Sequence, residues 1–251
     1  MDKRRIYSII YLICLILLVN SLPFSLFIKD EVVLFIISLV IKIGSILYIL
    51  YYIKKEELNS LKLDKPRLSH SKLLPLSLLC CSNFSVVIFQ NSQPQANIDM
   101  FGIFSGLVIA IGVAIVEELL FRSQVLEEFL MKKNTISAII YSSLIFGSVH
   151  LLNISSFASI PTVLVQACYT FFLGLVLGVV YTTTNNILFP IIFHFLFNFI
   201  NDILIVKLFI IKWDLTFFIV NIVIGIVLFI YMLLLVIRKG ADKNVTKIMD
   251  N

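Results

Sequence analysis

The sequence predicts an all-α membrane protein: a single domain over residues 1–251, built as a polytopic bundle of about eight transmembrane helices. Of its 251 residues, 60% are hydrophobic and only 14% are charged, whereas soluble domains contain roughly 25% charged residues. Apolar runs of about 20 residues, the length that a helix needs to cross a bilayer, recur between short polar segments. The net charge of +5 is scattered over these segments. We therefore expect the lipid bilayer as a partner, and no nucleic acid.

The apolar runs, taken in chain order, place the expected spans. The first run follows Lys3-Arg4-Arg5 but has no small-x-small cleavage site, so we expect it to be retained as a span and not removed as a signal peptide. The sixth contains Gly174 and Gly178, a spacing that lets helices approach closely. The expected spans are Tyr7–Ile28, Val32–Ile53, Leu73–Gln90, Phe101–Met131, Thr135–Leu152, Pro161–Thr182, Ile187–Val206 and Phe217–Ile237.

Basic residues are distributed unevenly between the two sides of these spans. If the spans alternate in direction, fifteen Lys and Arg residues lie on the side of both termini and three lie on the other side. Because basic residues are enriched in cytoplasmic loops, we expect both termini in the cytoplasm and a multi-pass protein of the cell membrane. Lys42, inside the second span, is expected to adapt through its long side chain; an interior position is the alternative.

Two acids and a base lie inside the fourth apolar run, in the segment Val116-Glu117-Glu118-Leu119-Leu120-Phe121-Arg122. Ionisable groups at bilayer depth cost about 2.5–3.5 kcal/mol each on insertion scales, so they need partners or a function. On a helix, Glu118 and Arg122 are four residues apart and can form an ion pair. Glu117 points to a different face. The pattern predicts one paired and one free carboxylate; a purely structural triad between helices is the alternative.

Two later spans also contain polar pairs at helical spacing. Phe146 and His150 are four residues apart late in the fifth span, and His194 and Asn198 are four apart in the seventh. A carboxylate can take a proton from water, an imidazole can orient that water, and an Asn/His pair can donate to a developing oxyanion. The set is sufficient for peptide hydrolysis. For a single buried histidine, a hydrogen bond between helices is the ordinary alternative.

The same side chains would also suit a divalent metal such as zinc. Imidazole and carboxylate are ordinary zinc ligands, so the candidate metal ligands are Glu117, His150 and His194. The sequence contains no His-Glu-x-x-His motif, and the three candidates come from separate helices. The four cysteines show no C-x-x-C spacing, so we expect neither a disulfide framework nor a thiolate zinc site. The use of a metal stays open.

Taken together, these motifs resemble the CAAX-protease and bacteriocin-processing family, also called the CPBP or Abi family. The resemblance rests on Glu117-Glu118-x-x-x-Arg122, Phe146-x-x-x-His150 and His194-x-x-x-Asn198, in that order on separate spans, and covers a core of about residues 101–202. It implies a glutamate-dependent intramembrane endopeptidase, usually classed as a metalloprotease. Its substrate would be a membrane-associated or leader-type peptide or protein, and the short chain resembles the bacterial members of the family.

The resemblance also implies a role for each motif. Glu117 would activate the attacking water, supported electrostatically by the Glu118–Arg122 pair. His150 would help to position the water, and His194 and Asn198 would form the oxyanion site. The expected span edges place His150 nearer the outer leaflet than Glu117, so helix tilt or a shifted boundary must bring them together.

Two other functions remain open at this point. One is a binding role without proteolysis, either as a bacteriocin self-immunity protein or as a membrane scaffold. The other is a transporter with a proton-coupled Glu/His relay, which broken helices and an internal repeat of spans would favour. The sequence shows neither feature clearly, so the protease is the main expectation.

Overall fold

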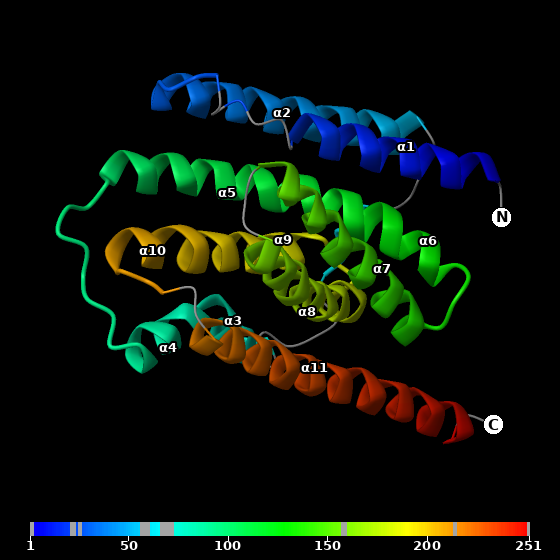
Figure 1. The fold of residues 1–251 in the computed structure, drawn as a ribbon. Coiled ribbons are helices and arrows are strands. Elements are labelled where there is room, and N and C mark those ends of the chain that lie inside the picture. Colours follow the sequence, from blue (N-terminus) through cyan, green and yellow to red (C-terminus); the bar gives the residue numbers. More distant parts are fainter. Residues whose placement is uncertain are drawn as a thin grey trace.

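The chain folds as a bundle of helices, shown in Figure 1 as a computed structural model. The structure describes residues 3–20, 24, 27–55, 61–65, 73–156, 160–212 and 215–249. The α-helices are α1 (Lys3–Asn20), α2 (Glu31–Lys55), α3 (Ser77–Cys80), α4 (Ser82–Phe89), α5 (Met100–Leu120), α6 (Glu127–Leu130), α7 (Thr135–Val149), α8 (Ile160–Thr184), α9 (Leu188–Phe197), α10 (Ile205–Leu208) and α11 (Leu215–Met249). Four shorter helical segments are 3₁₀-helical, η3 (Leu74–Leu76) and η5 (His150–Ser156), or π-helical, η4 (Phe121–Leu126) and η6 (Asn198–Leu204).

Among the described residues, five helical segments are long and apolar enough to cross a membrane. They are 31–55, 100–130, 135–153, 163–184 and 188–208, and a shorter apolar helix covers Ile219–Leu234. They correspond to the second and the fourth to seventh expected spans, which confirms an all-α, multi-pass membrane protein. The expected count of eight and the sides on which the termini lie are not confirmed. Most of the expected cytoplasmic loop Lys54–Lys72 lies outside the described residues.

The third expected span, Leu73–Gln90, is not one continuous helix. It is divided into η3, α3 and α4, with a break at Cys81. The residues after the break are held by polar contacts: the Asn83 backbone N–H donates to the Asn201 side-chain oxygen at 2.9 Å, and the Ser82 hydroxyl donates to that of Asn221 at 2.8 Å. These four residues, Ser82, Asn83, Asn201 and Asn221, are called the amide cluster below. Hydropathy detects the apolar run but not this break.

The helices pack in layers on either side of α5 (Figure 1). Helix α2 lies against one side of α5, with α1 beside α2, and α9 lies against the other side. Helix α8 packs against both α7 and α11, which makes it the central element of the bundle. Long α8 is correspondingly well buried, including residues Val176–Val180.

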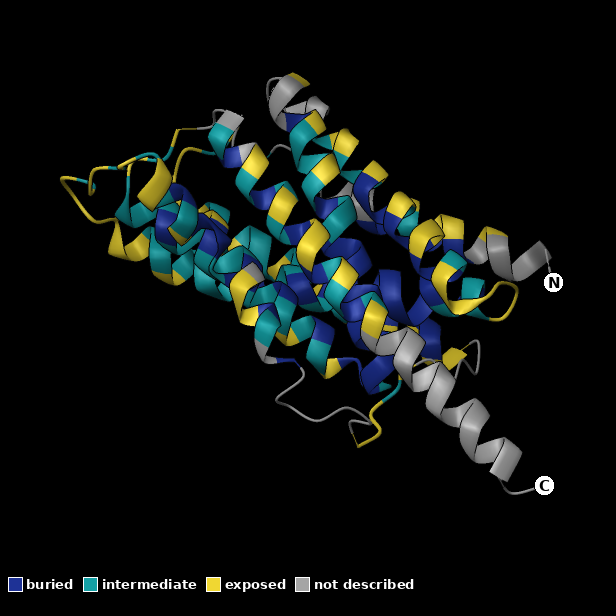
Figure 2. Ribbon diagram, turned by 90° about the horizontal axis from the view of Figure 1, so that it is seen from below, coloured by how far each residue is buried: buried dark blue, intermediate teal, exposed yellow. Residues whose placement is uncertain are grey.

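The outer faces of the bundle are apolar, as a lipid environment requires. On α2, for example, Val33, Ile36, Val40 and Leu47 are exposed, and exposed positions recur along the outer helices in Figure 2. Gly174 and Gly178 of α8 face α7, and a Cβ atom at residue 178 would lie 3.0 Å from the Ile139 side chain. The expected close helix approach at these two glycines is therefore confirmed. It fixes α7, and with it Phe146, against α8.

Candidate active site

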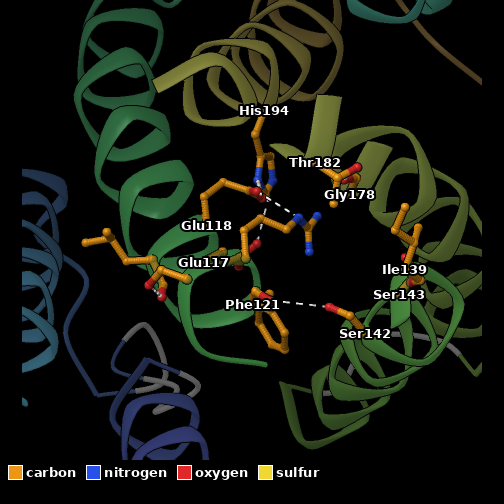
Figure 3. A network of polar contacts seen from close by, with 12 residues as sticks. Glu117, Glu118, Phe121, Ile139, Ser142, Ser143, Gly178, Thr182 and His194 are labelled. Atoms are coloured by element: carbon orange, nitrogen blue, oxygen red, sulfur yellow. Dashed lines mark hydrogen bonds and ion pairs between the residues drawn. The ribbon is translucent and has the colours of Figure 1, made fainter. Parts of the chain in front are cut away.

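The charged residues of α5 and α9 meet in the interior of the bundle. Nε of Arg122 lies 2.9 Å from Oε2 of Glu118, and Nδ1 of His194 lies 2.8 Å from Oε1 of the same carboxylate. Arg122, Glu118 and His194 are all buried, and Figure 3 shows the imidazole directed at the carboxylate. We call these three residues the charged cluster. The ion pair expected from the i,i+4 spacing is confirmed.

Glu118 has a role that sequence spacing did not indicate: it orients a histidine from another helix. A carboxylate can only accept hydrogen bonds when ionised, so Nδ1 of His194 donates to Glu118. This fixes the ring and leaves Nε2 on the side of Glu117. A carboxylate that orients an imidazole in this way is the arrangement found in hydrolase triads.

Glu117 differs from its neighbour although the two are adjacent in sequence. Its side chain is 23% exposed, whereas that of Glu118 is 0% exposed. Its Oε2 lies 3.6 Å from Nε2 of His194, which is longer than a hydrogen bond. Among the described residues, Glu117 is therefore held less tightly than Glu118, as the helix geometry predicted.

Phe146 joins the three motifs through its aromatic ring. Its ring centroid lies 4.9 Å from the Arg122 guanidinium carbon, 5.1 Å from the His150 ring centroid and 5.8 Å from that of His194. The phenylalanine is fully buried and also contacts Phe121. This explains why an aromatic residue lies four positions before His150: it packs against the charged cluster and sets the position of the imidazole.

A cavity of about 230 Å³ opens beside this cluster and collects the remaining site residues. Glu117, His150, His194 and Asn198 all line it, while Glu118 and Arg122 lie behind its wall. Nδ1 of His150 donates to the Phe146 backbone carbonyl oxygen at 2.9 Å, so its Nε2 is the ring nitrogen left for another partner. The structure thus brings His150 and Glu117 to one cavity, which resolves the offset expected from the span edges.

Lys42 of α2 also lines this cavity, and its ammonium group lies within electrostatic range of Glu117. The preferred expectation, that Lys42 adapts to its surroundings through its long side chain, was wrong; the structure shows the alternative, an interior position in the cavity wall. Hydropathy could not decide this, because it does not indicate which face of α2 packs on α5.

Two of the three helices that carry site residues are π-helical at the site. Segment η4 begins at Phe121 and contains Arg122, and segment η6 begins at Asn198. π-helical turns are rare and often occur at functional sites. Ser142 of α7 donates to the Phe121 backbone carbonyl oxygen, at the start of η4 (Figure 3). Residue spacing alone gave no signal for these turns, since sequence periodicity assumes regular α-helix.

The predicted metal ligands do not form a metal-binding group in this arrangement. Within the described residues, no three His, Cys, Asp or Glu side chains are grouped closely enough to hold a metal ion. Glu117 and His194 approach each other, and Nδ1 of His194 and of His150 bind protein acceptors, as in metal-binding histidines, which leaves Nε2 of each ring for another partner. A metal role for Glu117, His150 and His194 stays a prediction, which metal analysis of the purified protein would test.

Comparison with known proteins identifies the segment that carries this site. Residues 99–200 match the family model described as type II CAAX prenyl endopeptidase Rce1-like. This segment is an Rce1-like domain of the CPBP family. The resemblance inferred from the three motifs is confirmed, and all the candidate catalytic residues fall inside the match. No curated protein and no solved structure matches the chain.

The Rce1-like domain begins just before α5 and ends within η6. It therefore contains α5, η4 and α9, the elements that carry the charged cluster. The family assignment supports, at family level, a membrane endopeptidase that acts on a peptide at a membrane. Lys42 and Asp202 line the same cavity but lie outside the matched residues.

Proposed function

We propose that this protein hydrolyses a peptide bond within the membrane, with the Glu117 carboxylate as the general base. The observation that carries the proposal is the contrast between two adjacent acids: Glu118 is neutralised by Arg122 behind the cavity wall, while Glu117 opens into the cavity. A carboxylate held in a cavity with two imidazoles and an amide has the groups that hydrolysis requires. The substrate is a membrane-associated or leader-type peptide.

The reaction follows from the placement of these groups. Glu117 takes a proton from water as the water oxygen bonds to the carbonyl carbon, and the carbonyl π electrons move to its oxygen. The side-chain amide of Asn198 and Nε2 of His194, in its protonated form, donate hydrogen bonds to that oxyanion. The carbonyl then reforms, the C–N bond breaks, and the proton on Glu117 passes to the leaving amine. The products are one carboxylic acid and one amine, and Glu117 is regenerated.

The other residues prepare this step. His150 accepts a hydrogen bond from the attacking water at Nε2, because its Nδ1 is already bound to the Phe146 carbonyl oxygen. The Glu118–Arg122 pair holds the His194 ring at the angle that directs Nε2 towards the cavity. A pre-oriented donor needs no rearrangement as charge develops in the transition state, which is the main contribution of such sites to rate.

The test compares purified wild type with Glu117→Gln in detergent, on leader-type and prenylated peptides, with products identified by mass spectrometry. Loss of a general base should lower the rate by about 10²–10⁴-fold. Glu127→Gln is the matched control, because it removes a carboxylate from the same long helix at a residue that contacts Lys62 and does not line the cavity. Cleavage by Glu117→Gln at the wild-type rate would refute the proposal.

The same pair of variants also tests the proposal in cells. If deleting the gene produces a phenotype, wild type should restore normal behaviour and Glu117→Gln should not. Equal rescue by both would indicate a scaffold or self-immunity role without proteolysis.

A further inference from the structure

Asp202 is a charged residue at the candidate site that the proposed mechanism does not use. It lies on η6, four residues after Asn198 and eight after His194, and it lines the cavity with them. Its side chain is exposed. Among the described residues, no hydrogen bond or ion pair of its carboxylate is seen; its electrostatic neighbours are His194 and Tyr169. A carboxylate in a membrane-embedded helix to which no side chain is directly hydrogen-bonded or ion-paired marks a candidate binding position.

Asp202 also lines a second cavity, of about 360 Å³, on the far side from Glu117. The two cavities share this residue and therefore adjoin at it; together they are called the groove below. The floor of the groove is a row of α5 residues at four-residue spacing: Phe101, Ser105, Ile109, Val113 and Glu117. The row winds about 160° around the helix and spans about 24 Å along the helix axis, at 1.5 Å rise per residue.

The groove has walls from two helices. Residues of α2 form one wall, from Glu31 and Leu34 to Lys42, and residues of η6 and α10 form the other, from Asn198 to Lys207. Each wall approaches α5 closely at a glycine of α5. A Cβ atom at Gly112 would lie 2.9 Å from Cβ of Lys42 on α2, and a Cβ atom at Gly106 would lie 2.7 Å from the Ile203 side chain on η6. The sequence thus keeps the groove narrow.

The dimensions fit an extended peptide. At about 3.3 Å per residue, a strand of about seven residues would fill 24 Å. The second cavity presents apolar side chains, including Leu34, Phe35 and Ile109, and it ends at the ion pair between Nζ of Lys207 and Oδ2 of Asp99, 2.6 Å apart. Asp202 lies where this second cavity meets the cavity of Glu117, and its carboxylate is the charged group at that junction.

We propose that the groove between α2, α5 and η6–α10 binds the substrate as an extended strand, and that Asp202 selects a lysine or arginine side chain close to the scissile bond. Asp202 is about 6 Å along the helix from Asn198, which corresponds to about two residues of an extended peptide. Apolar substrate residues occupy the second cavity. This inference rests on the proposed function in one respect: the inner end of the groove is the cavity of Glu117.

Charge complementarity supports this occupant. A basic side chain opposite Asp202 would neutralise the carboxylate in an environment where an unpaired charge is costly. Charged pairs of this kind give specificity more than overall affinity, because a neutral or acidic side chain leaves the carboxylate unpaired or repelled. In this proposal Asp202 selects the substrate and Glu117 cleaves it.

The experiment uses the full-length protein in detergent and a set of apolar decapeptides in which lysine, norleucine or glutamate is placed at each position in turn. Cleavage is followed by mass spectrometry for wild type, Asp202→Asn, Asp202→Lys and the matched control Asp30→Asn. Asp30 precedes α2 and caps it through its side chain, which asparagine can replace. Wild type and the control should prefer lysine over norleucine about tenfold or more at one position, about two residues from the cut. Asp202→Asn should lose this preference, and Asp202→Lys should prefer glutamate.

Binding is measured separately with Glu117→Gln and fluorescein-labelled lysine and norleucine peptides, with and without Asp202→Asn. Tighter binding of the lysine peptide that depends on Asp202, with no cleavage by wild type, would support the groove and refute the proposed proteolysis. Cleavage of lysine and norleucine peptides at equal rates would refute the role of Asp202 and leave the proteolysis standing. A lysine preference that survives in Asp202→Asn would also refute it.

Discussion

Two clusters of buried polar side chains join the helices of this bundle, and they differ in charge and in access. The amide cluster links α4, η6 and α11 through neutral groups: the Asn201 side chain accepts from the Asn83 N–H and donates to the Cys80 carbonyl oxygen. The charged cluster links α5, η4 and α9, and it adjoins a cavity. Arg122 Nε and Nη2 have no well-aligned hydrogen-bond acceptor among the described residues.

This difference is why we assign the charged cluster, and not the amide cluster, to the proposed active site. A satisfied amide network stabilises the fold and leaves nothing free to react. A charged cluster with incompletely bonded donors contributes less to stability than well-packed apolar side chains would, which agrees with the catalytic role that we propose beside it. Buried polarity alone would not separate the two clusters, whereas charge together with an adjoining cavity does.

The largest expected effect comes from breaking the charged cluster. Arg122→Ala would leave the Glu118 charge buried without its cation, which costs about 3–5 kcal/mol. We expect a strong loss of folded protein, measured by size-exclusion chromatography and thermal unfolding in detergent. Glu117→Gln should leave the folded level nearly normal, because Glu117 is partly exposed in the cavity. Equal losses in the two variants would favour a structural triad instead of an active site.

A pair of asparagines on η6 gives the next contrast. Asn198→Ala removes the proposed oxyanion donor and should lower the cleavage rate by about 10²–10³-fold with little change in stability. Asn201→Ala should have the opposite effect. It removes hydrogen bonds of the amide cluster and should lower the free energy of unfolding by about 1–2 kcal/mol, the scale of interhelical hydrogen bonds in membranes. The cleavage rate per folded molecule should stay close to that of wild type. Thermal unfolding and peptide cleavage, measured on the same preparations, test both expectations. An unchanged cleavage rate in Asn198→Ala would show that Asn198 is not the oxyanion donor.

The smallest expected effect lies at the outer end of the groove. The side-chain hydrogen bond from Lys207, and then the Gly102 N–H, lower the pKa of Asp99 below its usual value. A lowered folded-state pKa means that the pair stabilises the protein above the unfolded pKa of about 3.9, and that this contribution is lost as pH falls through the folded value. Asp99→Asn keeps the cap to Gly102 but removes the charge.

Unfolding temperatures of wild type and Asp99→Asn should therefore differ slightly at pH 6 and converge as the pH falls below about 4. High salt should reduce the difference, because the pair is exposed. A difference that persists at low pH would indicate that Asp99 acts through the helix cap and not through its charge.

Sequence patterns predicted the fold class, which is confirmed, and the residues of the candidate site, but not the three-dimensional arrangement of those residues. Hydropathy found the long apolar helices, because membrane spans require them, and the i,i+4 spacing found the Glu118–Arg122 pair. Neither pattern could predict the contact of Glu118 with His194, because the two residues are 76 positions apart in the sequence. Nor could it indicate the break at Cys81 or the place of Lys42 in the cavity, because both depend on which helix faces which.

Orientation in the membrane stays a prediction of the sequence. The excess of basic residues on one side predicts that reporter fusions at Asp64 and Asn97 lie inside and outside the cell, respectively. Both reporters on the same side would overturn the predicted arrangement of spans.

The π-helical turns η4 and η6 have a consequence for how the chain tolerates change in length. Each turn accommodates an extra residue relative to α-helix, so the helix after it is rotated by about 100° compared with an uninterrupted α-helix. Deleting one residue within η4, such as Gln124, and letting the turn become α-helical would cancel this rotation, so Glu127 and the residues after it would keep their present faces. The same deletion in the regular part of α5 would turn every later residue of the helix to a new face. The extra residue in η4 therefore shapes the backbone around Arg122 without changing the direction in which α6 presents its side chains.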